Sequence, residues 1–133
     1  MTRPTDLPPL RSDDDGLSRV RDLVGAASAD RTIWLMFIDG DGWQNPVLMP
    51  IDGVSAVPDP RLLSGLTEIL CGIGGDLATD RAGSVIFTYE RLGPDEVLAD
   101  DLAWADALRG ACRSSGIEVR GVFLSTRSGV RRL

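Results

Sequence analysis

Two short runs of almost uninterrupted apolar residues indicate strands. The segments Thr32–Ile38 and 84–89 are too short and too uniformly apolar for a surface helix. Such runs are typical of strands buried on both faces of a sheet. Asp39-Gly40-Asp41-Gly42 follows the first run and resembles the start of a calcium loop, but the further oxygen ligands and closing Glu are missing. Asp-Gly instead favours a hairpin, with residues 46–51 as the returning strand.

Three segments repeat apolar residues at helical spacing. The first helix is expected over about residues 14–27, because three consecutive aspartates place capping oxygens and negative charge before it. The second is expected to begin at Asp59-Pro60 and to end at Gly74-Gly75. The third is expected over about residues 98–115, ending at Gly116. Its predicted inward face consists of Leu98, Leu102, Ala105, Leu108 and Cys112.

Two further strands, over residues 117–124 and 130–133, complete the predicted order α-β-β-α-β-α-β-β. A hairpin followed by β-α-β gives an α/β fold with a mixed sheet, and the helices cover either one face or both, in two or three layers. The 133-residue chain is long enough for one domain, which we place at residues 13–133. Residues 1–12, with three prolines and no periodicity, are expected to form a disordered tail.

This order resembles the cytidine-deaminase-like and JAB/MPN-type folds. The C-terminal half, SVIFTYERLGPDEVLADDLAWADALRGACRSSGIEVRGVFLSTRSGVRRL, is more specifically similar to the JAB domain of RadC-like proteins, and VPDPRLLSGLTEIL resembles that family's proline-led helix. The resemblance covers residues 32–133. It implies a zinc motif of His-x-His, seven residues, Ser, two residues and Asp. Here those positions hold Thr88, Glu90, Leu98 and Asp101, so only the Asp is kept.

The composition excludes the chemistry that this resemblance implies. The chain has no histidine, and all its basic residues are arginine. The imidazoles of a JAB zinc site are therefore absent, and residues 39–58 contain no Glu to serve as its base. Cys71 and Cys112 are not spaced as the zinc pair of a deaminase, and we expect both to be buried free thiols. The resemblance thus predicts a retained fold without catalytic residues, metal or cofactor.

Thr88, Glu90, Arg91 and Asp101 form the candidate binding groove. If the loop before the third helix follows the family, Glu90 and Asp101 lie close together and two carboxylates hold a divalent cation weakly, as in a hydrolase. The groove with Arg91 is alternatively a site for a nucleotide or another anion in a regulatory domain. The simpler interpretation, which we favour, is that Glu90 is solvated and Asp101 stabilises the helix N-terminus.

Charge is strongly polarised near the end of the chain. Residues 94–106 carry five acids and no base, whereas residues 107–133 carry six arginines and one acid. The overall charge is −6, which argues against nucleic acid and anionic membranes as partners. No membrane-length apolar run or signal peptide is evident, so a cytoplasmic location is expected.

The arginines of the terminal strands suit contacts with the acidic segment of another protomer, or protection of an edge strand. Trp34 is expected in the core, and Trp104 at the core edge or in a contact. Trp43, in the hairpin turn, suits an interface. We therefore expect a non-catalytic binding or scaffold module that self-associates as a homodimer. Its predicted interface residues are Trp43, Arg120, Arg127, Arg131 and Arg132.

Overall fold

The computed structural model, which describes residues 7–133, confirms the α/β fold and its order of elements. In this part of the chain five strands form one mixed sheet in the order β2-β1-β3-β4-β5, in which only β3 and β4 pair in parallel. The helices are α1 (Asp13–Leu23), α2 (Pro60–Leu77) and α3 (Ala99–Ser115). The strands are β1 (Thr32–Ile38), β2 (Gln44–Ile51), β3 (Ser84–Glu90), β4 (Glu118–Thr126) and β5 (Gly129–Arg132).

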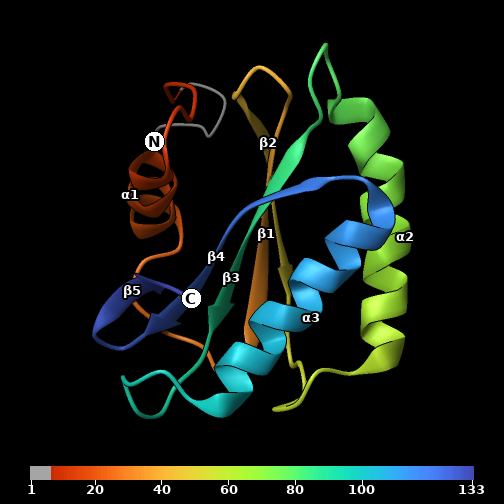
Figure 1. Cartoon of the computed structure of the whole chain (residues 1–133). Helices are drawn as coiled ribbons and strands as arrows, with labels where there is room; N and C mark the ends of the chain where they lie inside the picture. The colour runs from red at the N-terminus through yellow and green to blue at the C-terminus, as the bar shows by residue number, and fades with distance from the viewer. Residues whose placement is uncertain (1–6) are drawn as a thin grey trace.

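The molecule has three layers, with α1 on one face of the sheet and α2 and α3 on the other (Figure 1). Alternating side chains along the strands divide the core accordingly. Met36 and Ile86 face α1, whereas Leu35 and Phe87 face α2 and α3. Both faces of β1 and β3 are thus covered, which explains why their sequences are apolar almost without interruption.

The hairpin, the start of α2 and the end of α3 follow the prediction. Asp59 caps α2 by accepting the Arg61 N–H at 2.9 Å, and Pro60 is the first helical residue. Gly116 ends α3 in the left-handed conformation, with φ at 79°. The predicted end of α2 is wrong, however, because the helix passes through Gly74-Gly75 to Leu77. The buried Leu77 side chain and the bond from the Gly40 N–H to its carbonyl, at 3.0 Å, extend the helix beyond the glycines.

The start of the chain also differs from the prediction. The tail expected over residues 1–12 lies partly outside the described residues, but Leu10 is only 2% exposed and its N–H donates to the Gly42 carbonyl at 2.8 Å. Ser12 and Asp15 form a capping box at the start of α1, which ends at Leu23 and not at residue 27. The segment from Leu10 onwards is therefore part of the domain, because it closes the core beside α1.

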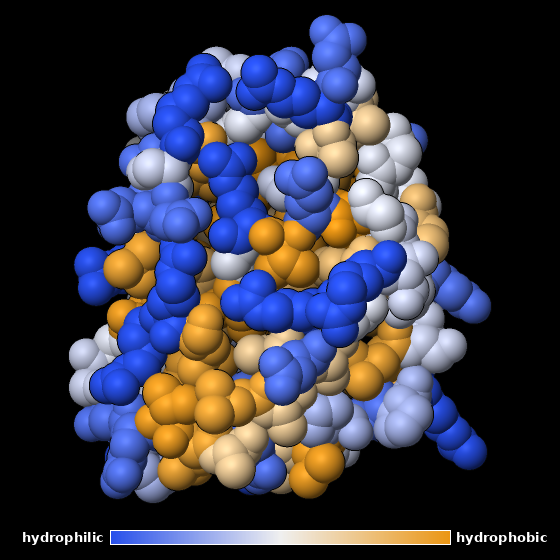
Figure 2. All heavy atoms as spheres, in the orientation of Figure 1, coloured by the Kyte–Doolittle hydropathy of each residue, from blue (hydrophilic) through white to orange (hydrophobic). Residues whose placement is uncertain are grey.

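The inward face of α3 is rotated relative to the prediction. Leu98 and Leu102, expected inside, are 37% and 51% exposed, and Figure 2 shows apolar side chains gathered around the start of α3. Asp101 and Trp104 face inward instead, both 0% exposed. The Trp104 ring packs against Tyr89 with centroids 6.0 Å apart, and its N–H donates to the Ser55 carbonyl at 3.1 Å. Trp104 is therefore a core residue that fixes the loop before α2.

A pair of glycine substitutions tests the close packing at the end of the hairpin. A Cβ at Gly40 would clash with the Arg81 carbonyl and the Thr79 hydroxyl, whereas a Cβ at Gly65, inside α2, meets nothing within 4 Å. We expect Gly40→Ala to lower the free energy of unfolding by about 1–3 kcal/mol through overpacking. Gly65→Ala should raise it by up to about 1 kcal/mol through helix propensity. Urea unfolding measures both, and equal effects of the two variants would contradict this packing.

Candidate functional site

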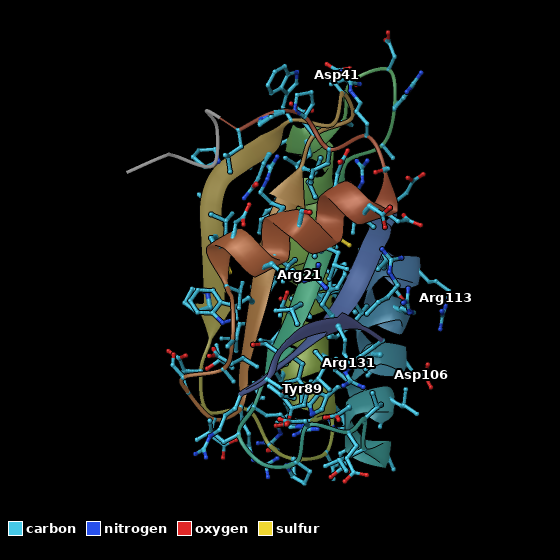
Figure 3. The ribbon with its side chains drawn as sticks, turned by 90° about the vertical axis from the view of Figure 1, so that its left-hand side faces the viewer. Arg21, Asp41, Tyr89, Asp106, Arg113 and Arg131 are labelled. Carbon is cyan, nitrogen blue, oxygen red and sulfur yellow. The ribbon has the colours of Figure 1, made fainter. Side chains whose placement is uncertain are left out.

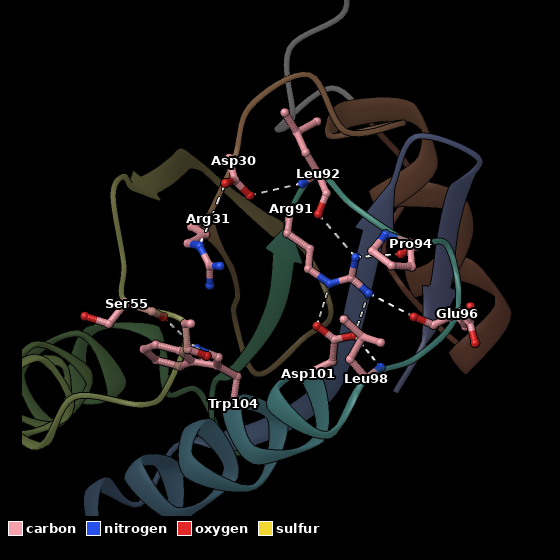
Figure 4. Close-up of polar contacts among 11 residues, drawn as sticks. Asp30, Arg31, Ser55, Arg91, Leu92, Pro94, Glu96, Leu98, Asp101 and Trp104 are labelled. Carbon is pink, nitrogen blue, oxygen red and sulfur yellow. Dashed lines mark hydrogen bonds and ion pairs between the residues drawn. The ribbon is translucent and has the colours of Figure 1, made fainter.

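A buried ion pair joins the end of β3 to the first turn of α3. Arg91 directly follows β3, and its Nε and Nη2 donate to Asp101 Oδ1 and Oδ2, each at 2.7 Å (Figure 4). Both side chains are almost completely buried. Planar guanidinium and carboxylate groups bond in this two-pronged way with high geometric specificity. The pair therefore fixes the position of α3 against β3.

The remaining polar atoms of the pair bind the loop between β3 and α3. The Arg91 guanidinium donates to the carbonyls of Pro94 at 2.6 Å and Glu96 at 2.9 Å, and Asp101 Oδ2 accepts the Leu98 N–H at 2.8 Å. The hydrogen bonds that Arg91 donates to Asp101 raise the pKa of Arg91 above its usual value, against the effect of burial. Arg91 is thus a permanently charged structural group whose donors are directed to the protein itself.

Glu90 lies on the opposite face of the sheet. Its Oε2 accepts the N–H groups of Ser28 at 2.8 Å and Ala29 at 3.2 Å, and its Oε1 accepts the Trp34 indole N–H at 2.9 Å. Successive side chains of a strand point to opposite faces, so Glu90 and Arg91 diverge. Glu90 is 4% exposed and anchors the loop after α1, whereas we expected it to be solvated.

The four residues of the predicted groove therefore divide between two faces. Arg91 and Asp101 come together on the α3 face, while Thr88 and Glu90 are buried on the α1 face. A shared cation would require Glu90 and Asp101 to lie close together, and this prediction is wrong. The pleat at the end of β3 directs Glu90 to one face of the sheet and Arg91, the partner of Asp101, to the other. Within residues 7–133, no group of three or more acidic or cysteine side chains is placed to hold a metal ion.

The predicted interface residues do not form one surface. Trp43 is 47% exposed at the β1–β2 turn, beside one edge of the sheet, whereas Arg131 lies in β5 at the other edge. Arg120 occupies the bulge of β4 and donates to the Leu10 carbonyl at 2.6 Å. Arg132 lies over the Phe123 ring, 5.3 Å from its centroid. Of the five predicted residues, Trp43, Arg127 and Arg131 remain exposed without such a contact in the described structure.

The two sheet edges are poorly suited to strand addition. Proline has no N–H to donate, and the edge strand β2 carries Pro46 and Pro50 at positions of the same parity. The other edge, β5, is four residues long and carries Arg131 and Arg132. Short, charged or proline-containing edges are the usual means by which proteins avoid edge-to-edge pairing. A partner therefore has little backbone to pair with at either edge.

Two surface hollows lie near the N-terminal end of β4. One, of about 600 Å³, has a mixed lining of charges that includes Asp39, Arg81 and Glu118. The other, of about 410 Å³, lies beside the second half of α3 and is lined by Arg109, Arg113 and the apolar side chains of Ile117 and Val119. Neither includes the residues of the predicted groove. Both hollows thus lie away from the position that the family resemblance indicates.

A buried polar cluster lies on the α1 face, and no motif in the sequence predicts it. The side chain of Arg19 donates to Gln44 Oε1 at 2.7 Å and to the Pro8 carbonyl, which ties α1, β2 and the N-terminal segment together. Burial lowers the pKa of Arg19. The two side chains meet only because α1 crosses the sheet at this point. Their contact holds the N-terminal segment against the sheet.

Comparison with protein-family models, curated proteins and solved structures finds no match for this chain. The similarity of residues 32–133 to RadC-like JAB domains therefore stays a prediction from the sequence. Among the described residues, no helix is both long enough and apolar enough to cross a membrane.

The two cysteines provide a test of local packing. Cys112 is buried, and this burial raises its pKa to about 11, whereas Cys71 is exposed on α2, contrary to the prediction that both are buried. Because the thiolate is the reactive form, native protein near pH 8 should react with one equivalent of a thiol reagent, and denatured protein with two. Cys71→Ser should remove the native reaction. A native protein with two fast thiols would contradict the burial of Cys112.

The buried ion pair predicts a strongly non-additive mutant cycle. Arg91→Met or Asp101→Leu alone leaves one buried charge without its partner and should lower the free energy of unfolding by about 3–5 kcal/mol. The double variant removes both charges and should be more stable than either single variant. Chemical unfolding measures the cycle. Additive losses in the double variant would show that the two side chains act independently.

Proposed function

We propose that this protein is a non-catalytic binding module that self-associates as a homodimer. The proposal is supported by the way in which the buried polar groups near the end of β3 are used. Arg91 and Asp101 bond to each other and to the loop between them, and Glu90 bonds to Trp34 and the loop after α1. Such groups stabilise the fold and leave little free bonding capacity for a substrate.

The observation that carries the binding role is the exposed apolar surface at the start of α3. Val97 and Leu98 are each 37% exposed, and Leu102 is 51% exposed. Figure 2 shows these helix turns as part of an apolar area bordered by hydrophilic side chains. Clustered exposed apolar side chains with a polar rim are typical of protein interaction sites. In this proposal the surface contacts another protein chain.

The relation to the JAB domains of RadC-like proteins belongs to the same proposal. The order of elements and the mixed sheet are compatible with a member of that family that has lost its zinc motif. In such a protein Thr88 and Glu90 stand at the motif positions of the two histidines, and Asp101, the one motif residue that is kept, pairs with Arg91. The two other candidate functions, a carboxylate hydrolase and an anion-binding regulatory domain, gain no observation that favours them.

Light scattering and thermal shift together test this function. We expect the mass of the purified protein to rise with concentration from 14.3 kDa towards twice that value. A ligand that binds the folded state raises the melting temperature. Because the proposed module has no metal or nucleotide site, we expect no change in melting temperature with Zn²⁺, Mn²⁺, Mg²⁺ or a nucleoside triphosphate.

Two outcomes would contradict the proposal. A constant monomer mass at millimolar concentration would remove self-association. Stabilisation by a divalent cation that is lost in Asp101→Asn would favour the hydrolase, and stabilisation by a nucleotide that is lost in Arg91→Met would favour the regulatory domain. A variant at exposed Arg127, Arg127→Met, is the matched control for the second case.

A further inference from the structure

We infer that self-association occurs through α3, which packs antiparallel against α3 of a second copy, with Asp106 of each copy beside Arg109 of the other. This inference rests on the self-association proposed above and names the surface that carries it. It differs from the sequence prediction, which placed the interface at the hairpin and the terminal strands.

One side of α3 carries a continuous stripe of residues that are not used by the core. At 3.6 residues per turn, the spacing of the stripe keeps its members within about 80° of one another around the helix axis. Leu98, Leu102, Asp106 and Arg113 are exposed and Arg109 is partly exposed. Figure 3 shows Asp106 and Arg113 projecting outward from α3 at the right-hand side of the view. The members of this α3 stripe, in order, are Leu98, Leu102, Asp106, Arg109 and Arg113.

The stripe is complementary to itself in one direction only. Its first half is apolar and ends in a negative charge, and its second half is positive. In an interface with two-fold symmetry, residue i of one copy contacts residue j of the other, and j contacts i. An antiparallel pair centred between Asp106 and Arg109 places these opposite charges together twice. It also lays the aliphatic stem of the partner's Arg113 along Leu102. A parallel pair would place Asp106 beside Asp106.

The charges of the stripe are available for such contacts. In the described structure, neither Asp106 nor Arg109 nor Arg113 forms an ion pair within its own chain. The sheet edges offer a weaker alternative. Pro46 and Pro50 remove N–H groups from β2, and two β5 strands in antiparallel pairing would bring Arg131 and Arg132 of both copies together.

The size of the contact sets the expected affinity. The 17 residues of α3 span about 25 Å, so a single pair of helices buries less than the roughly 1,600 Å² of a standard interface. We therefore expect a dimer in rapid exchange with monomer, with a dissociation constant in the micromolar range or weaker. Salt should weaken it, because the ion pairs at its centre are screened.

Charge reversal at two positions tests this arrangement by sedimentation equilibrium. Asp106→Arg places like charges together at both symmetry-related contacts and should raise the dissociation constant of the dimer at least about tenfold. Arg109→Asp should do the same. The double variant Asp106→Arg/Arg109→Asp exchanges the charges and should return to within about threefold of the wild-type value. Leu102→Ser should also weaken the dimer, because it removes the apolar contact.

Two controls distinguish the α3 interface from contacts elsewhere on the surface and from loss of folding. Arg131→Asp reverses an exposed charge on β5 and should leave the dissociation constant unchanged or lower it only slightly. Circular dichroism and melting temperature confirm that each variant is folded, as expected for changes at surface positions. A dimer that persists in both single variants, or a double variant that stays monomeric, would overturn the α3 interface and leave self-association standing. A wild-type chain that is monomeric throughout would overturn the proposed function itself.

Discussion

The ion pair between Arg91 and Asp101 determines how α3 is placed on its face of the sheet. The chain crosses from β3 to the parallel strand β4 through α3, which lies on one face of the sheet. The ion pair fixes the rotation of this helix about its axis at the first turn. Taking two charges out of water costs free energy that is recovered only when both are fully hydrogen-bonded, as they are here. Specific geometry is what this pair adds to the fold. With Asp101 turned inward, Leu102, about 100° further around the helix, faces solvent.

The preceding residue along β3 secures the opposite layer. Glu90 holds the loop after α1 through two backbone N–H groups, and it also accepts the Trp34 indole N–H. Two neighbouring residues at one strand end therefore connect the sheet to both of its helical layers. Their polarity has a structural cause, which explains why polar residues in a buried strand end are an ambiguous sign of a functional site.

Local sequence signals predicted the elements well, but not their rotation or depth. The apolar runs of β1 and β3, the Asp59-Pro60 start of α2 and the end of α3 at Gly116 depend on neighbouring residues alone. The inward position of Asp101 depends on Arg91, and counting apolar residues misses a charge that is buried with a partner. Local patterns also missed the burial of Leu77, whose contacts extend α2, and the exposure of Cys71, because both depend on how α2 packs against the rest of the molecule. The candidate site failed for a related reason, because the pleat at Glu90 and Arg91 directs two adjacent side chains to different layers.

The buried ion pair also restricts how this chain can change during evolution. A substitution that neutralises Arg91 or Asp101 alone passes through a protein with an uncompensated charge in its interior, and most domains have only about 5–15 kcal/mol of stability in total. The two positions are therefore expected to change together. Related chains would keep both charges or replace both with apolar side chains. The fold places no such restriction on the exposed positions of α3, so those outside the proposed dimer interface can diverge while the helix itself stays in place.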